Sequence, residues 1–201
     1  MNFYNIFPTT IGMFSLERDL TQEELDFLNN QDKRSNAGNT TSVDNYVLRK
    51  ENLKDLNSFF LESVNKYFDE LYQPKYDASL YITQSWVNYT EPKQWHHKHQ
   101  HPNSFISGVF YVNADITKDR IYFYRDHYDQ LKIIPREFNI TNSDSWWFEV
   151  GTGRLILFPS SLTHMVEMKE HEGTRISLSF NTFLKGTLGD NNNLTELVLG
   201  D

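Results

Sequence analysis

Two signals meet in the stretch Trp95-His96-His97-Lys98-His99-Gln100-His101-Pro102-Asn103-Ser104-Phe105-Ile106-Ser107-Gly108-Val109-Phe110-Tyr111-Val112. Its first part holds four of the seven histidines of the chain. Its second part, from Phe105 to Val112, is rich in the aromatic and β-branched residues that favour strands. Open sites of jelly-roll proteins lie where strands end, so the stretch predicts a metal site at the mouth of a β structure.

Strand geometry limits which histidines can bind one ion together. Successive side chains of a strand point to opposite faces, so His97, His99 and His101 should share one face and His96 should lie on the other. Neighbours on one face are about 6.6 Å apart, a gap that two imidazoles can close around a metal at about 2 Å per bond. His97 with His99 and His99 with His101 are equally good chelates on this ground. The metal-free alternative is a solvent-exposed, histidine-rich loop.

The composition indicates a mainly β domain and excludes some partners. A chain of 201 residues can bury a real core as one domain, and aromatic residues make up 15% of it. The net charge of −8, without any run of Lys or Arg, argues against nucleic acid and anionic membranes as partners. Because the chain has no cysteine, any metal must be held by nitrogen and oxygen ligands.

Two helices precede a series of strands in the pattern of the sequence. Thr21 and Glu24 form a capping box that predicts a helix to about Asn30, followed by a polar loop over 31–45. An apolar stripe starting at Leu53 predicts a second helix, which Pro74 ends. Strands are expected at 81–89, 105–113, 120–124, 146–150, 154–158, 165–168 and 175–183, and a loosely held polar tail at 186–201.

A distant histidine and an arginine supplement the first cluster. His164 follows Phe158-Pro159-Ser160 at the start of an expected strand. Arg175 opens another strand, whose alternation turns Arg175, Ser177, Ser179 and Asn181 to one face. An inward guanidinium needs an anion, which a carboxylate supplies in a bidentate pair, and the Ser177 hydroxyl can donate to the same carboxylate.

In combination, these motifs resemble the 2-oxoglutarate/Fe(II) oxygenases of bacteria and their viruses, distant relatives of the prolyl hydroxylases. The similarity covers about residues 80 to 184 and rests on Trp86-Val87-Asn88, His99-Gln100-His101-Pro102, Ser107-Gly108-Val109-Phe110-Tyr111-Val112, Phe158-Pro159-Ser160, His164, Arg175-Ile176-Ser177 and Phe180-Asn181. It implies a double-stranded β-helix (a jelly roll, cupin-like) with N-terminal helices packed on its outer face. The single domain 1–201 would then comprise helical support (1–79), the oxygenase core (80–184) and a tail (185–201).

The resemblance also implies a site. Carried over to this chain, it makes His99, His101 and His164 the Fe(II) ligands, and Arg175 and Ser177 the residues that bind 2-oxoglutarate. Prolyl hydroxylases have a carboxylate where this chain has His101, whereas His-x-His-Pro is the usual form in the nearer family. Three neutral ligands leave the iron one charge more positive and should strengthen its hold on anionic 2-oxoglutarate. The missing amide hydrogen of Pro102 marks a strand end and supports this register.

Other residues receive subsidiary predictions. Asp126 is either a displaced carboxylate ligand or a turn residue. His96 and His97 are candidates for orienting the ligands from outside. The Tyr111 hydroxyl is a candidate contact to the co-substrate if Tyr111 rather than Phe110 faces inward, and Asn88 is a candidate contact near its metal-proximal end.

We therefore expect a dioxygenase that hydroxylates a C–H bond of an unidentified substrate, with succinate and CO2 as co-products. The alternatives are a cupin-like three-histidine oxygenase without 2-oxoglutarate, and a non-catalytic jelly-roll binding protein. A zinc hydrolase lacks a well-placed general base. We expect the substrate to be a small molecule, a peptide or a protein. Because the sheet edges of β-rich domains often pair between copies, a homodimer is a further expectation. The N-terminus has no signal-peptide pattern, so we expect a soluble, cytoplasmic protein.

Overall fold

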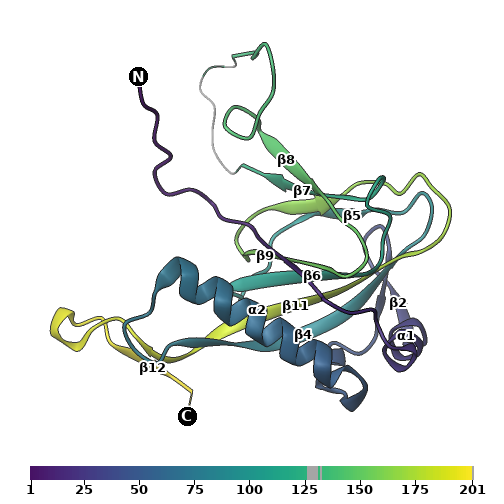
Figure 1. Ribbon diagram of the computed structural model, residues 1–201, viewed down its shortest axis with the longest axis horizontal. Coiled ribbons are helices and arrows are strands. Elements are labelled where there is room, and N and C mark those ends of the chain that lie inside the picture. Colours follow the sequence, from purple (N-terminus) through teal and green to yellow (C-terminus); the bar gives the residue numbers. More distant parts are fainter. Residues whose placement is uncertain (126–130, 132, 201) are drawn as a thin grey trace.

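Two antiparallel sheets face each other in the computed structural model, which describes residues 1–125, 131 and 133–200 (Figure 1). Within these residues the larger sheet has eight strands, in the order β1-β9-β6-β11-β4-β3-β2 with β12 paired to β11. Its strands are β1 (Gly12–Ser15), β2 (Lys33–Ser35), β3 (Thr40–Ser42), β4 (Ser79–Thr90), β6 (Ile106–Asn113), β9 (Arg154–Pro159), β11 (Arg175–Leu188) and β12 (Leu197–Leu199). The smaller sheet has the order β5-β10-β7-β8, formed by β5 (His96–His99), β7 (Arg120–Tyr124), β8 (Ser145–Glu149) and β10 (His164–Val166). The mainly β, jelly-roll prediction is confirmed.

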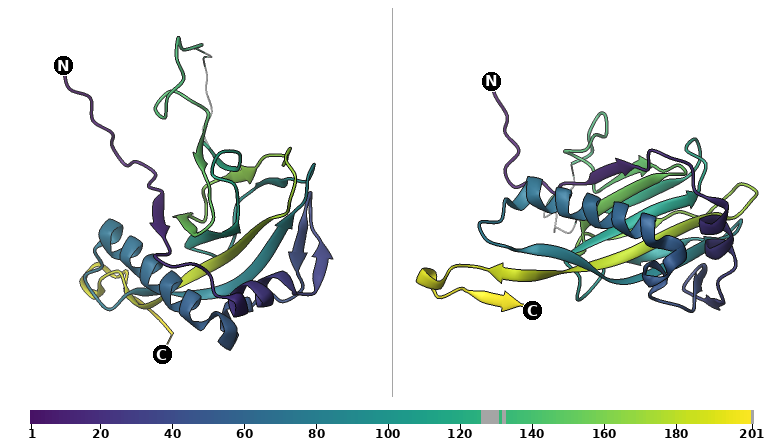
Figure 2. Two further views of the ribbon diagram at one scale, coloured as in Figure 1. Left: turned by 45° about the vertical axis from the view of Figure 1, so that its right-hand side comes forward. Right: turned by 60° about the horizontal axis from the view of Figure 1, so that its bottom comes forward.

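The helices lie on the outer side of the larger sheet. Helix α2 (Lys54–Tyr72) crosses that face, while α1 (Gln22–Asn29) packs near one end of it (Figure 2). Short 3-10 turns at Val47–Arg49 and Glu51–Leu53 connect the β2–β3 hairpin to α2, and a third lies at Asn191–Asn193. The core between α2 and the sheet is made by one set of alternating strand residues, including Phe110, Leu178 and Phe180. The other set faces the smaller sheet and includes Val109, Tyr111 and Phe158.

The capping signals act as the sequence predicts. The Thr21 hydroxyl accepts from the amide of Glu24 at 3.2 Å, and the Glu24 carboxylate accepts from the amide of Thr21 at 2.8 Å. Helix α2 ends at Tyr72, where Gln73 adopts the left-handed conformation before Pro74. Leu71, the last residue of the predicted stripe, is 42% exposed, so the buried stripe ends one turn earlier than its pattern suggests.

Strands occur in three segments for which none was predicted; one is Gly12–Ser15, which pairs with β9 as β1, and the other two are polar. The polar segment 31–45 contains the β2–β3 hairpin, which joins the larger sheet by pairing Thr40 with Tyr89. Strand β11 continues to Leu188, and Leu197–Leu199 returns along it as β12. Both additions are short and lack a buried apolar face, so their sequences carry no alternating signal. Backbone pairing with an existing edge is what orders them.

A close approach between two strands explains Gly108. Gly108 on β6 lies opposite Phe180 on β11, and a Cβ at position 108 would be 2.2 Å from the Phe180 ring. The ring cannot move away easily, because it is fully buried and stacks on Phe60 at a centroid distance of 5.1 Å. The absence of a side chain at position 108 therefore lets the two strands and α2 pack together.

We expect Gly108→Ala to lower the free energy of unfolding by about 1–3 kcal/mol through overpacking. Chemical denaturation of the metal-free protein measures this change. The smaller side chain in Gly108→Ala/Phe180→Leu should recover part of the loss. A single variant as stable as the parent would show that the Phe180 ring has room to shift.

Candidate metal centre

Three histidines converge at one end of the space between the sheets: one from β5, one from the segment just after β5 and one from β10. His99 on β5 pairs with His164 on β10, and the ligand-capable nitrogens of His99, His101 and His164 all lie within 4.8 Å of one another. The ring centroid of His164 is 4.3 Å from that of His99 and 5.1 Å from that of His101. We call these three residues the inner histidine set. The structure thus brings together the three ligands that the resemblance implies.

Backbone carbonyls fix the tautomers of two of these imidazoles. Nδ1 of His99 is 2.7 Å from the carbonyl oxygen of His97, and Nδ1 of His164 is 3.0 Å from that of Leu162. A carbonyl oxygen only accepts, so each Nδ1 carries the proton and each Nε2 keeps its lone pair. Such a bond is the usual means by which a metal-binding histidine is oriented. Each ring therefore offers one nitrogen to one ion.

Burial keeps the inner set uncharged. Burial, with the nearby His164, lowers the pKa of His101 to about 3. Burial, with the nearby His99, lowers the pKa of His164 to about 4, and burial also lowers the pKa of His99. All three imidazoles are therefore neutral near pH 7, which is the form that binds a metal ion. Three neutral nitrogen donors fit Fe(II) and other borderline divalent metals better than Mg²⁺ or Ca²⁺.

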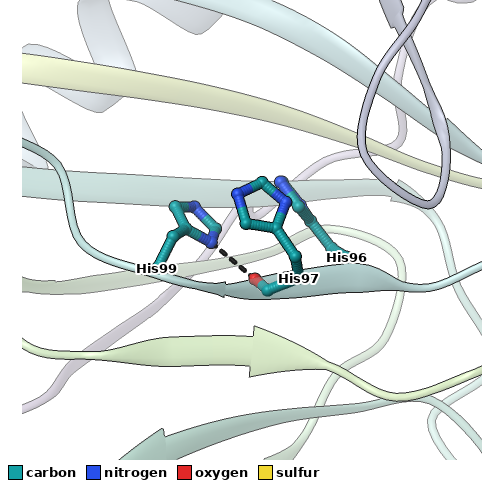
Figure 3. Close-up of side chains that lie close together, drawn as sticks. All are labelled: His96, His97 and His99. Carbon is teal, nitrogen blue, oxygen red and sulfur yellow. Dashed lines mark hydrogen bonds between the residues drawn. The ribbon is translucent and has the colours of Figure 1, made fainter.

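A β-bulge overturns the expected placement of His96. His99 pairs with His164 and His96 with Val166, so three steps on β5 lie opposite two steps on β10. The extra residue breaks the strict alternation. The ring of His96 consequently stacks on that of His99 at a centroid distance of 4.6 Å, on the same side as His97 (Figure 3). The predicted position of His96 on the opposite face of the strand is therefore wrong.

The other predicted residues form a row across the larger sheet. Ser177 on β11 pairs with Tyr111 on β6 and with Asn88 on β4, so their side chains share the face toward the smaller sheet. The hydroxyl of Tyr111 and Oδ1 of Asn88 are buried and have no hydrogen-bond partner in the described part of the chain. Within Arg175–Thr182, Ser177 alone is not fully buried. Tyr111 rather than Phe110 faces inward.

Unpaired buried polar atoms are costly, and they usually mark a place for a ligand or water. The Tyr111 hydroxyl can donate to an anionic oxygen, while Nδ2 of Asn88 is already used by Ser179 at 2.9 Å. The row lies between the histidines and Arg175. On β4, Trp86 contacts His101, Asn88 belongs to the row two residues later, and Thr90 pairs with Arg175. A diacid that reaches from the histidines past Tyr111 toward Arg175 fits this arrangement.

Arg175 already has a partner within the chain. Its Nη1 donates to Oδ1 of Asp119 at 2.9 Å, and both side chains are at least 95% buried. Nε2 of His171 lies 3.2 Å from the same oxygen, and the amide of Asp115 donates to the other carboxylate oxygen at 2.9 Å. The guanidinium has five N–H groups, so the pair with Asp119 leaves donors for a second anion.

Sequence reasoning missed Asp119 and its neighbours. Asp119 lies 56 residues from Arg175, in a turn before β7, and nothing in its local pattern distinguishes it from a solvated turn residue. The one available signal was that an inward arginine needs an anion, which another part of the same chain can supply. Asp126, the other suggested carboxylate ligand, lies outside the described residues.

A cleft of about 440 Å³ opens next to the inner set. Phe123, whose ring centroid is 6.2 Å from that of His164, lines it together with Leu162, the residue that accepts from His164. Its remaining wall comes from the N-terminal segment, β7, β8 and the segment before β8. The wall has an aromatic and aliphatic part (Tyr4, Ile6, Pro8, Ile11, Tyr124, Ile140, Trp146 and Phe148) and a polar part (Asn5, Thr9, Arg125, Thr141, Ser143, Asp144 and Ser145). The cleft thus adjoins two residues that contact His164, although none of the inner histidines lines it.

Three convergent, neutral imidazoles at the open end of a jelly roll could hold a non-haem metal ion. The sequence model of the family described as "Putative 2OG-Fe(II) oxygenase" matches residues 84–181, the span that holds every residue of the candidate centre. Over residues 84–181 the chain is similar to this family of 2-oxoglutarate/Fe(II) oxygenases, and the match indicates an oxygenase-type enzyme. The resemblance stated from the sequence is confirmed.

Solved structures show the same fold at low identity. HygX from Streptomyces hygroscopicus, crystallised with nickel and 2-oxoglutarate, is 10% identical with a TM-score of 0.59, over 87% of this chain and 82% of that one. The 2OG-Fe(II) oxygenase family oxidoreductase from Burkholderia pseudomallei is 12% identical with a TM-score of 0.56, over 78% and 74% of the two chains. SnoN, the non-haem alpha ketoglutarate dependent epimerase from nogalamycin biosynthesis, is 12% identical with a TM-score of 0.59, over 87% and 78%.

The comparison with curated proteins gives no match. None of the helices in the described part of the chain combines the length and apolarity needed to cross a membrane.

Proposed function

We propose that the protein is a dioxygenase that binds Fe(II) through His99, His101 and His164 and hydroxylates a C–H bond at the expense of 2-oxoglutarate. The observation that carries the proposal is the convergence of three neutral imidazole nitrogens within 4.8 Å at the open end of a family-typical jelly roll. Bound Fe(II) supplies dioxygen activation: one oxygen atom enters the succinate formed as 2-oxoglutarate loses CO2, and the other enters the substrate as a hydroxyl group.

The residues of the chain have separate tasks in this reaction. The Tyr111 hydroxyl, which has no partner in the described part of the chain, is suited to donate to a carboxylate of 2-oxoglutarate, and Ser177 lies beside it. The donors of Arg175 that are not used by Asp119 are suited to the far carboxylate. Phe158, whose ring centroid is 4.6 Å from that of His164, keeps water away from one side of the centre.

The lining of the cleft indicates the chemical class of the substrate. Its aromatic and aliphatic wall favours a small molecule or a peptide side chain with an apolar part. The net charge of −8 disfavours nucleic acid.

Two observations favour a second candidate function. Arg175 is already neutralised by Asp119, and the inner set lacks a carboxylate, as in cupin-like oxygenases that bind substrate directly to a three-histidine metal. Such an enzyme would not need 2-oxoglutarate.

The two functions are separated by one experiment. The purified protein is loaded with Fe(II) under anaerobic conditions and mixed with 2-oxoglutarate, and then exposed to air. We expect a visible charge-transfer band in the first step and succinate in the second, because slow uncoupled turnover does not require the true substrate. Iron binding with neither band nor succinate would favour the cupin-like reaction, and failure to bind iron would reject both.

A further inference from the structure

A second group of histidines lies directly beside the proposed iron ligands. The ligand-capable nitrogens of His96, His97 and His99 all lie within 4.8 Å of one another (Figure 3). Their ring centroids are separated by 4.6 Å for His96 and His99, 4.6 Å for His97 and His99, and 5.3 Å for His96 and His97. We call these residues the outer histidine set. The bulge in β5 creates it, since regular alternation would carry His96 to the other face.

One ring nitrogen of the outer set, Nδ1 of His97, is buried without a hydrogen-bond partner among the described residues. A buried imidazole nitrogen without a partner loses its hydration and gains nothing in return, which a ligand at that position would correct. The rings of His96 and His97 also lie close to that of His99. Imidazoles gain little stability from packing on one another, and a shared metal ion would account for their approach.

We propose that the outer set is a second metal site for a borderline divalent ion such as Zn²⁺, and that it competes with the inner set for His99. Three imidazoles are a sufficient protein ligand set for Zn²⁺, which takes water as its fourth ligand. His99 is common to both sets, and its Nδ1 proton is held by the carbonyl oxygen of His97. Its single lone pair, on Nε2, serves one ion at a time. An ion in the outer set therefore leaves only His101 and His164 for iron.

The competition depends on the proposed function in one respect, namely that His99 also serves the inner set. The outer site itself stands on its own residues. Nitrogen sites bind Zn²⁺ more tightly than Fe²⁺. The arrangement therefore makes the enzyme sensitive to zinc bound by His96 and His97, which are not proposed iron ligands, together with the shared His99.

Co²⁺ titration of single variants tests both sets, with visible absorption of bound Co²⁺ as the readout. His101→Ala disables the inner set at a partly exposed position, and this variant should bind one Co²⁺ per chain through the outer set. His101→Ala/His97→Ala should bind Co²⁺ more weakly by over about a hundredfold, since even partners of metal ligands change affinity by about 10- to 100-fold. His97→Ala should keep one ion in the inner set, and the parent chain should bind one tight ion rather than two. His171→Ala, which removes a histidine from neither set, should match the parent.

Each failure has its own meaning. If folded His101→Ala binds no Co²⁺, or if adding His97→Ala leaves its affinity unchanged, the outer site does not exist. If His97→Ala binds no Co²⁺, the inner ligand set and the proposed function fail instead. Two equally tight ions in the parent chain would overturn the competition for His99. For His101→Ala crystals soaked in Zn²⁺, an anomalous-scattering peak bonded to His96 and His97 would support the site, and a peak elsewhere only would reject it.

Discussion

His164→Ala is expected to abolish the visible band formed by anaerobic Fe(II) and 2-oxoglutarate, together with succinate production in air. His164 supplies the one inner ligand that is distant in the chain, and it is 3% exposed. Its loss leaves two imidazoles, and we expect iron held with 2-oxoglutarate to weaken by at least about a hundredfold, more than the effect of losing an outer-shell partner. Total metal uptake is the wrong measurement, because the outer set keeps all three of its histidines.

Adding free imidazole to this variant distinguishes a metal-ligand role of His164 from a structural role. The truncation leaves space beside His99 and His101, so added imidazole should restore part of the band if His164 acts as a ligand. A merely structural histidine would not be replaced in this way. Circular dichroism establishes that the variant is folded. A normal band in His164→Ala would show that another residue binds the iron.

Arg175→Ala is expected to damage both folding and co-substrate binding. It leaves the carboxylate of Asp119, which is 3% exposed, without its main partner, and breaking a buried ion pair costs about 3–5 kcal/mol of unfolding free energy. We expect the lower end of that range, because His171 and the amide of Asp115 still contact Asp119. Affinity for 2-oxoglutarate should fall by about tenfold to over a hundredfold, corresponding to about 1.5–3 kcal/mol for a hydrogen bond to a charged group.

Asp119→Asn separates the two effects. In Arg175→Ala/Asp119→Asn the uncompensated charge is gone, so denaturation should show part of the stability regained while 2-oxoglutarate affinity stays low. Asp119→Asn alone should bind 2-oxoglutarate at least as tightly as the parent, since the guanidinium loses a competing anion. The dependence of the visible band on 2-oxoglutarate concentration measures this. If both single variants weaken 2-oxoglutarate equally, Arg175 acts only through the fold; if Arg175→Ala leaves the affinity unchanged, it does not bind the co-substrate.

Much of the fold was readable from the chain because it rests on local patterns. The strand β7 (Arg120–Tyr124) has the predicted bounds, and the capping box at Thr21 begins α1 where expected. Alternation also placed Arg175 and Ser177 on one face of β11. Ser177 pairs with Tyr111 and Asn88 on the inner face, and Arg175 lies two residues earlier on the same strand. Short edge strands such as β2 and β12 escaped prediction because they bury little apolar surface and depend on pairing with a sheet already formed.

The sequence by itself determined the two helices and most of the strands, because hydrophobic periodicity is a property of neighbouring residues. The family resemblance, rather than periodicity, implied the jelly roll and the ligands His99, His101 and His164. Only the tertiary structure decided which side chains from distant segments contact the predicted site residues. The bulge that turns His96 toward His99 is a mismatch between two strands, and the pairing of Arg175 with Asp119 joins residues 56 positions apart. Such contacts depend on the register of separate segments, which the local pattern of a single segment does not contain.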